Sequence, residues 1–581
     1  MPTMTETRGS WGSWLEFLFS ALGSMVGLGN IWRFPYVCYQ NGGGAFLIPF
    51  FVAMLVCGCP LLFLEMLYCQ YSSLGPGKVW VICPLFKGIG CGMMILTFVV
   101  SIYYTMIMGW TLYYLAMSCS AVLPWTLCPD NQTAVAACVT ATNGSFHNVT
   151  ATLKNTTTSE VTHLTQSYVS TEEAFWFKDV LGLSPGIEEM GSIRWPLLLC
   201  LLAAWIIVSL CLIKGIKSMG KVVYVAASAP YVILTCLLIR GCLLPGSGDG
   251  LYYYMVPAWS KLMEFEVWRS AATQVFFSIG MGFGLISTLA SYNKFNNNCY
   301  RDALILPLLD CLTSVYAGMV IFAFLGYMAH ISNKSIDNVV DEGPGLVFIA
   351  YPTALSTLPL PQLWSVLFFL MLFCVGLDSQ FMHIQAITTA LSDCFPSVLM
   401  ARRTMLTFGV CLISFLLGIP LASQGGFYIL NLMDWYIASV SVMLIAFVEV
   451  MVLAWVYGTD SLYDDINAMI GFRPNPVWKY AWRYFTPIFV LVLWTSGLVN
   501  FKTIGSVYRG YPPWADGIGM VIAILPVLAI PVKLVWTLLK IKGSLKQRLR
   551  QSLRPSPLWR PAVNPDVSGD LELKSLNKSK V

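Results

Sequence analysis

Apolar runs of about 20 residues or more recur along nearly the whole chain, separated by shorter polar segments. A helix needs about 20 apolar residues to cross a hydrocarbon core about 30 Å thick, and in lipid every backbone polar group must be paired within the protein. The pattern therefore predicts an all-α polytopic membrane protein with twelve transmembrane helices. The predicted spans are 13–37, 45–70, 88–118, 196–213, 220–242, 268–293, 303–331, 362–393, 403–420, 426–457, 479–500 and 517–541.

The longest hydrophilic segment, from about 120 to 195, carries a cluster of Asn-X-Ser/Thr motifs, which are glycosylation acceptors in extracellular loops. Cys128 and Cys138 bracket a short polar stretch of this loop and would form a disulfide if the loop is extracellular. The predicted acceptors are Asn131, Asn143, Asn148 and Asn155, with Asn333 in a later outer loop.

Counted from this loop, the basic residues of the connecting segments fall on the opposite face, as the positive-inside rule requires. They include Lys214, Lys217, Lys221, Lys294, Arg301, Arg402, Arg403 and the segment 540–554. We therefore expect a multi-pass plasma-membrane protein with both termini in the cytosol.

Composition supports this assignment, since 57% of the 581 residues are hydrophobic and only 11% are charged. The net charge of +5 is small and the basic residues are scattered along the chain. We therefore expect no nucleic-acid partner, and we expect the lipid bilayer to be the surroundings of the protein. Most of the 18 cysteines stand singly in apolar spans without metal-ligand spacing. No nucleophile converges with a base, so the sequence does not predict an enzyme.

Two spans are interrupted by glycines. The first contains GSMVGLGN at 23–30, and the sixth contains FSIGMGFG at 277–284. Interrupted segments at corresponding positions of two halves indicate a midplane binding site between inverted repeats, where carbonyls face a cation and amides face an anionic group. Close helix packing is the alternative reading of these glycines.

Polar residues inside the same spans favour the binding site, because ionisable groups within a membrane are costly and mark sites or pathways. These residues are Asn30, Gln274, Ser278, Asn293, Asp310, Asp378 and Ser379.

Several long motifs in this order resemble the neurotransmitter:sodium symporters. They are GLGNIWRFP at 27–35, NGGGAF at 41–46, SYN at 291–293 and GLDS at 376–379. The resemblance extends from about residue 8 to 541. It implies two inverted five-helix repeats with broken helices 1 and 6, plus two C-terminal helices.

The expected organisation follows from the same resemblance. Residues 1–12 form a cytosolic segment, 13–242 the first repeat, 243–457 the second repeat, 458–541 the last two helices, and 542–581 a disordered tail.

The resemblance implies two sodium sites made of oxygen ligands, which suit a hard cation. The first would use the Met25 carbonyl, the side chains of Asn30, Ser278 and Asp310, and the substrate carboxylate. The second would use the carbonyls of Gly23, Val26 and Val375 with the side chains of Asp378 and Ser379. For either serine alone, a hydroxyl bonded to its own helix is the alternative.

By the same resemblance, the substrate carboxylate would lie on the amides from Gly27 to Gly29, including Leu28, and on the Tyr104 hydroxyl. The remaining pocket residues would be Met25, Val100, Phe277, Ser278, Gly280, Phe283, Ser379 and His383. Monoamine-transporting members carry an aspartate at the position of Gly27. Its absence favours a small amino acid or amino-acid-like substrate that brings its own carboxylate.

Two charged pairs would gate the pathway by similarity, each closing one face in turn. The outer pair is Arg33 with Asp434, and the inner pair is Arg8 with Asp393, supported by Trp11 and Tyr292. Taken alone, an arginine or aspartate at such a position is more often a solvated charge than a gate residue. Glu65 is expected to accept hydrogen bonds from unwound backbone.

The chain departs from chloride-dependent members, which it resembles at Gln274, Ser278 and Ser314. They carry a tyrosine where Phe50 stands and an asparagine where Asp310 stands. One hypothesis is that the Asp310 carboxylate replaces chloride, which makes transport weakly dependent on chloride or independent of it. The competing account is a protonated Asp310 beside a bound chloride.

His383 and Met25 are further departures. His383 lies one helical turn after Ser379 and either contacts the distal end of the substrate or is a neutral histidine bonded within the bundle. Met25 is bulkier than the usual alanine and would narrow the pocket. These changes keep open a second class of function, a transporter-fold protein that transports little and acts as a sensor or membrane partner.

Overall fold

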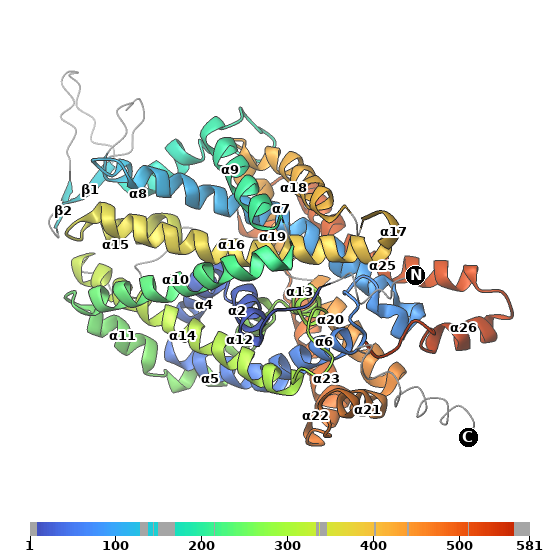
Figure 1. Ribbon diagram of the computed structural model, residues 1–581. Coiled ribbons are helices and arrows are strands. Elements are labelled where there is room, and N and C mark those ends of the chain that lie inside the picture. The colour runs from blue at the N-terminus through green and yellow to red at the C-terminus, as the bar shows by residue number, and fades with distance from the viewer. Residues whose placement is uncertain are drawn as a thin grey trace.

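The computed structural model describes residues 9–127, 138–142, 145–148, 169–213, 215–332, 336, 346–399, 402–437, 441–508 and 510–562. Helices dominate this part of the chain, in agreement with the predicted all-α class. Among the described residues, nine helices are long and apolar enough to span a membrane, and ten if the bent first pair counts as one span. Figure 1 shows them gathered into one elongated bundle.

The first predicted span is broken into α2 (Trp14–Met25), α3 (Leu28–Ile31) and α4 (Arg33–Gln40), and the chain bends by 59° at the break. The sixth is divided into α12 (Phe265–Ile279) and α13 (Leu285–Ala290). Neither half of the sixth span reaches spanning length alone, and α9 (Trp195–Cys211) is 17 residues long. Every predicted span contains helix, but these short segments are not long enough to cross a membrane alone. The number of single spanning helices is therefore smaller than the twelve predicted spans.

The remaining spans are formed by helices that agree with the predicted ranges. They are α5 (Gly44–Ala53) continued by α6 (Cys59–Ser72), α7 (Gly88–Ser118), α10 (Ile216–Cys242), α14 (Cys299–Ser332), α16 (Pro361–Cys394), α18 (Arg403–Gly418), α19 (Gly426–Tyr436) with α20 (Val442–Met451), α23 (Thr486–Val499) and α25 (Pro513–Lys540).

Shorter helices lie in the connections between spans. They are α8 (Thr171–Ala174), α11 (Ser247–Met255), α15 (Tyr351–Ser356), α17 (Pro396–Leu399), α21 (Thr459–Ile470), α22 (Val477–Tyr480) and α24 (Ile504–Val507).

A small sheet forms in the long hydrophilic loop. Its strands β1 (Cys138–Thr142), β2 (Ser145–Asn148) and β3 (Val169–Ser170) have the order β2-β1-β3. β1 pairs antiparallel with β2, with Thr142 opposite Ser145, and parallel with β3. The sheet lies at one end of the bundle (Figure 1).

The C-terminal segment is wrongly predicted as disordered over 542–562. Helix α26 (Leu545–Leu553) begins with a capping box between Ser544 and Gln547, which pairs backbone amides at the helix start. The chain then returns to the bundle, where the Trp559 ring lies 5.2 Å from the Tyr71 ring and its Nε1 donates to the Tyr457 hydroxyl at 3.0 Å. Aromatic packing therefore anchors a segment whose composition alone predicts disorder.

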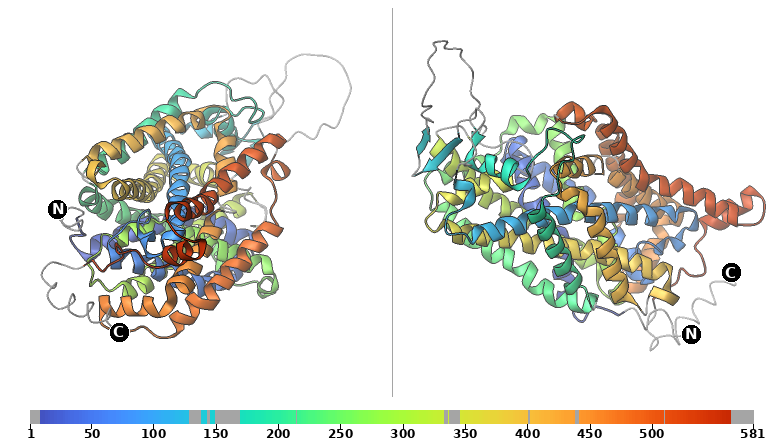
Figure 2. Two further views of the ribbon diagram at one scale, coloured as in Figure 1. Left: turned by 90° about the vertical axis from the view of Figure 1, so that its right-hand side faces the viewer. Right: turned by 90° about the horizontal axis from the view of Figure 1, so that it is seen from above.

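The core around the two breaks is built by α7 and α16, which pack against each other, and by α2, α6, α10 and α14 around them (Figure 2). Both breaks thus lie among buried helices rather than at the lipid-facing surface. This placement positions the functional residues.

Candidate functional site

The break in the first span leaves backbone groups directed into the core. The Gly27 N–H is held by the Met25 carbonyl at 3.0 Å and by Asn30 Oδ1 at 3.2 Å. A Cβ added to Gly29 would meet no atom within 4 Å, so open space adjoins this residue. The Leu28 N–H lies 3.4 Å from the Tyr104 hydroxyl. Amides, a tyrosine hydroxyl and free volume therefore coincide where the sequence predicts the substrate carboxylate.

The break in the sixth span depends on three glycines in the left-handed region. Gly280, Gly282 and Gly284 have φ of 70°, 75° and 73°, which glycine adopts without steric cost. Glu65 compensates the unwound backbone, since its Oε1 accepts from the Gly282 N–H and its Oε2 from the Ser287 hydroxyl, both at 3.0 Å. The predicted role of Glu65 is confirmed.

Three of the residues predicted for the first sodium site, Asn30, Ser278 and Asp310, form one buried cluster, whereas the Met25 carbonyl accepts from the Gly27 N–H. Asn30 Nδ2 lies 3.1 Å from Ser278 Oγ, 2.9 Å from Asp310 Oδ1 and 2.9 Å from Ser314 Oγ. The Ser278 hydroxyl donates to Asp310 Oδ2 at 2.6 Å. Side chains from two further helices therefore place three oxygens around the Asn30 amide nitrogen, next to the first break.

The residues predicted for the second site also converge. Ser379 Oγ lies 3.4 Å from the Gly23 carbonyl, and a Cβ on Gly23 would come within 2.9 Å of Asp378 Oδ2. Asp378 Oδ1 is buried and has no hydrogen-bond partner within the described chain. A small cavity lined by Gly23, Val26, Val375 and Asp378 adjoins this oxygen. A buried carboxylate oxygen without a donor, beside carbonyls and an empty space, fits a small cation.

The chloride-associated residues show one unexplained group. Gln274 Oε1 is buried without a partner among the described residues. Phe50 provides no hydroxyl and packs edge-on to Phe34, with ring centroids 4.9 Å apart. The Ser314 hydroxyl donates to the backbone carbonyl of Asp310, in its own helix, at 3.0 Å.

His383 is bonded within its own helix and also lies beside the predicted substrate pocket. Its Nδ1 is 2.8 Å from the Ser379 carbonyl, and because a carbonyl only accepts, this nitrogen carries a proton. The ring centroid lies 5.7 Å from that of Tyr104. The histidine can therefore hold its own helix and border the pocket at the same time.

The other predicted pocket residues are distributed around the breaks. Val100, Phe283 and Met25 are buried, with Met25 only 1% exposed. The Phe283 carbonyl accepts from the Thr97 hydroxyl at 2.7 Å. A Cβ on Gly280 would meet only Leu285, at 3.7 Å, which leaves space next to the pocket.

The predicted outer gate residues are not paired in this conformation. The Arg33 guanidinium lies 3.9 Å over the Phe277 ring, whereas Asp434 accepts from the Tyr103 hydroxyl at 2.9 Å. Arg33 and Asp434, both within the described chain, form no ion pair within 4.0 Å. The Arg33 guanidinium therefore contacts an aromatic ring, and the Asp434 carboxylate contacts a tyrosine hydroxyl, in place of each other.

The opposite face is held together near the N-terminus. Trp11 donates its backbone N–H to the Tyr292 carbonyl at 3.3 Å and its Nε1 to the Leu289 carbonyl at 3.1 Å. Asp393 accepts from the Gly75 N–H at 2.9 Å. Arg8, its predicted partner, lies outside the described residues. Trp11 and Tyr292 are thus in contact, as the support for an inner gate requires.

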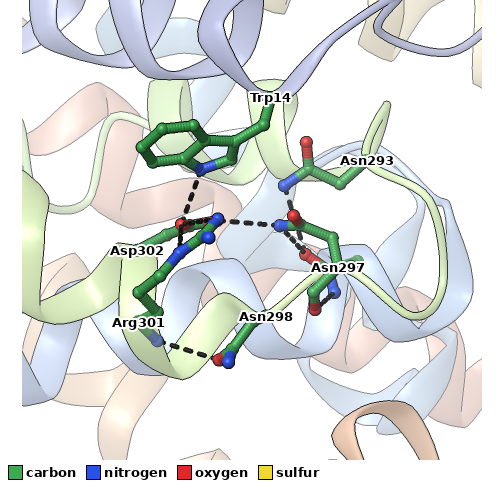
Figure 3. A network of polar contacts seen from close by, with 7 residues as sticks. Trp14, Asn293, Asn297, Asn298, Arg301 and Asp302 are labelled. Atoms are coloured by element: carbon green, nitrogen blue, oxygen red, sulfur yellow. Dashed lines mark hydrogen bonds and ion pairs between the residues drawn. The ribbon is translucent and has the colours of Figure 1, made fainter.

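A second network on this face was not identified from the sequence (Figure 3). Trp14 Nε1 donates to Asp302 Oδ1 at 2.9 Å, and the Arg301 guanidinium lies 4.2 Å over the Trp14 ring while pairing with Asp302 at 3.1 Å. Asn297 Nδ2 donates to Asp302 Oδ2 at 2.8 Å. The polar run NKFNNN at 293–298, just before a helix that begins with a charged turn, was the available signal.

Most residues of the predicted disulfide and glycosylation sites lie outside the described part of the chain. Cys128, Asn131, Asn143, Asn155 and Asn333 lie outside the described residues. Cys138 is in β1 and Asn148 in β2, and their side chains are not described.

A bundle of membrane-spanning helices with two broken helices around buried oxygen clusters defines the class of ion-coupled membrane transporters. The chain matches the Sodium:neurotransmitter symporter family over residues 8–541 and belongs to that family. It is a multi-pass membrane transporter and not an enzyme.

Two glycine transporters from Xenopus laevis are among its relatives. The sodium- and chloride-dependent glycine transporter 2 is 41% identical over 574 residues, which cover 96% of this chain and 72% of that protein. The sodium- and chloride-dependent glycine transporter 1 is 41% identical over 578 residues, which cover 98% and 91%.

Proposed function

We propose that this protein is a sodium-coupled symporter for a small neutral amino acid such as glycine, in the plasma membrane with both termini cytosolic. The observation that carries the proposal is the cluster at the first break. There, open space adjoins Gly29, and the Leu28 N–H lies 3.4 Å from the Tyr104 hydroxyl. The Asn30 amide next to it donates to the Asp310 carboxylate. A substrate carboxylate in this space would complete the first sodium site.

Coupling follows from the shared contact. If the substrate carboxylate is a sodium ligand, each ligand raises the affinity of the other by the same factor. The second site at Asp378 and Ser379 would bind another sodium ion between the broken helix and α16. Sodium entering down its gradient and the membrane potential would then drive uptake, and the potential contributes about 2.3 kcal/mol per charge per 100 mV.

We further propose that chloride is unnecessary or weakly required. In this proposal the Asp310 carboxylate supplies the negative charge beside the first sodium ion, and Phe50 provides no donor for an anion. A carboxylate and a chloride in the same low-dielectric region would repel each other strongly.

Radiolabelled uptake in cells expressing the full chain tests both statements. A panel of small amino acids headed by glycine is offered with sodium replaced by choline and, separately, with chloride replaced by gluconate. Uptake that requires sodium and persists in gluconate is the expected result. Absence of uptake despite surface expression would refute transport of these substrates, and loss of uptake in gluconate would refute the role of Asp310.

A further inference from the structure

A large cavity lies where the last membrane helix meets the C-terminal segment. Its volume is about 1150 Å³, and its walls come from the start of α7, the end of α16, the last turns of α25, and α26 with the segment that follows it. In Figures 1 and 2 this region projects from the end of the bundle opposite the small sheet. The cavity shares no lining residue with the predicted substrate pocket, although Asp393 of the predicted inner gate is in its wall.

The walls formed by the C-terminal segment are fixed to the rest of the protein. Arg548 donates from Nε to the Gly543 carbonyl at 2.7 Å and from Nη1 to the Leu538 carbonyl at 3.3 Å, which holds α26 against the end of α25. The Ser556 N–H donates to the Val81 carbonyl at 2.9 Å. The C-terminal segment therefore forms one wall of the cavity and is held in place by these hydrogen bonds.

The lining is strongly basic. Among the described residues, Asp393 is the single acidic side chain that lines the cavity, and the cationic ones are Lys78, Lys87, Lys533, Lys540, Arg550 and Arg554. Within the described chain, Lys87, Lys533, Arg550 and Arg554 have no carboxylate within 4.0 Å. Like charges brought together around one space repel, and an anion that contacts several of them would remove that repulsion.

The helices beside the cavity carry side chains of the kinds found at a membrane interface. On α25, Val535 and Leu539 are 54% and 71% exposed, as expected for side chains that face lipid. Trp536 lies on the same turns, with Lys540 Nζ 4.8 Å over its ring, and such amphipathic aromatics mark the headgroup region. Leu545 on the basic helix α26 is 70% exposed, which gives that helix an apolar side for the membrane surface.

We propose that this cavity binds the headgroup of an anionic phospholipid that carries more than one phosphate, with its acyl chains along the apolar surface of α25. Several phosphate groups match six cations better than a single phosphodiester does, because each phosphate can accept hydrogen bonds from more than one lysine or arginine. The lipid-facing surface beside the opening favours a lipid over a free anion of the same chemistry. The inference is independent of which substrate is transported.

Binding to the purified full-length protein in phosphatidylcholine nanodiscs tests this directly. The probes are dioctanoyl phosphatidylinositol bisphosphate, dioctanoyl phosphatidylserine, and inositol trisphosphate as the free headgroup. The test variant is Lys533→Gln/Arg550→Gln. The matched control is Lys542→Gln/Lys546→Gln, which removes two charges from the same region at positions that do not line the cavity.

The expected result is that the bisphosphate lipid binds more tightly than phosphatidylserine and than the free headgroup. Its affinity should fall at least about tenfold in the test variant and change little in the control. Equal losses in both double variants would indicate unspecific surface charge and overturn the proposal. Equal affinity for inositol trisphosphate and the lipid would overturn the lipid assignment in favour of a soluble anion. Thermal melting of each variant confirms that it is folded.

Discussion

The Ser278 hydroxyl donates a hydrogen bond to Asp310 Oδ2 at 2.6 Å, and this contact joins the broken sixth span to α14. In chloride-dependent members that the chain resembles, an asparagine stands at the position of Asp310. A neutral amide there would leave the charge of a neighbouring sodium ion unbalanced. The ion requirement of transport is therefore expected to depend on this one carboxylate.

We predict that Asp310→Asn makes uptake dependent on chloride. Without the carboxylate, an anion must supply the negative charge, so uptake in gluconate should fall by about tenfold or more relative to uptake in chloride, the effect expected for a lost charged hydrogen-bond partner. Uptake by both proteins is measured across a chloride series at fixed sodium.

Asp378→Asn is the matched control, since it neutralises the carboxylate of the second predicted sodium site. It should lose uptake at every chloride concentration. If Asp310→Asn behaves in the same way as Asp378→Asn, chloride does not substitute for the carboxylate and the charge-balance account fails.

The network around Trp14 predicts a latch on the face proposed to be cytosolic. Trp14→Phe keeps an aromatic ring under Arg301 but removes the 2.9 Å hydrogen bond to Asp302, an interaction with a charged group worth about 1.5–3 kcal/mol. The N-terminal part of α2 should therefore open more often. Hydrogen exchange of residues 9–25, followed by mass spectrometry in sodium, should be about tenfold faster or more than in the parent protein.

Trp195→Phe provides the comparison for this experiment, because Trp195 is 66% exposed at the start of α9. Exchange of residues 9–25 should be unchanged in that variant. Unchanged exchange in Trp14→Phe as well would show that the hydrogen bond does not limit opening.

Local sequence signals were sufficient for the breaks and for the residues around them. Glycines at Gly27 and Gly280 interrupt runs that are otherwise mostly apolar, and intramembrane polar groups such as Asp310 are costly enough to be informative singly. The structure places these residues together because both breaks face the same buried helices, α7 and α16. The breaks and their polar residues were therefore predictable.

Contacts between distant segments were not predictable in the same way. Trp14 and Asp302 are 288 residues apart, and no periodicity links them. The separation of Arg33 from Asp434 reflects the conformation adopted, which a residue pattern does not encode. Helix α26 has a local signal, the capping box at Ser544 and Gln547, but the basic and polar composition of the tail is typical of disorder.

We predict that His383→Ala admits larger substrates. The ring lies 5.7 Å from the Tyr104 ring, so its removal leaves unfilled space beside the predicted pocket. Neutral amino acids with larger side chains should then inhibit uptake of the labelled substrate about tenfold more effectively, since a few buried methylene groups contribute this much.

The control is His330→Ala, which removes a histidine near the end of α14, away from Tyr104. It should leave the order of inhibitors unchanged. An identical inhibitor order in His383→Ala would assign this histidine to its helix hydrogen bond alone.

The last prediction concerns the buried carboxyl Glu172 in the long hydrophilic loop. This side chain is 3% exposed and accepts from the Thr171 hydroxyl at 3.0 Å, and burial raises its pKa above the usual value of 4.5. Because the folded-state pKa is raised, the fold disfavours the ionised form, so the cost to stability is fully present above the folded-state pKa. The cost disappears as the pH falls through that pKa towards 4.5.

Glu172→Gln keeps an acceptor without a charge and should therefore melt at a higher temperature than the parent at pH 7.5, with the difference shrinking towards pH 4.5. Melting curves of the two purified proteins at several pH values measure this difference, and Glu189→Gln, which changes an exposed carboxyl of the same loop, should show none. A constant difference at all pH values would mean that the effect comes from packing and not from ionisation of Glu172.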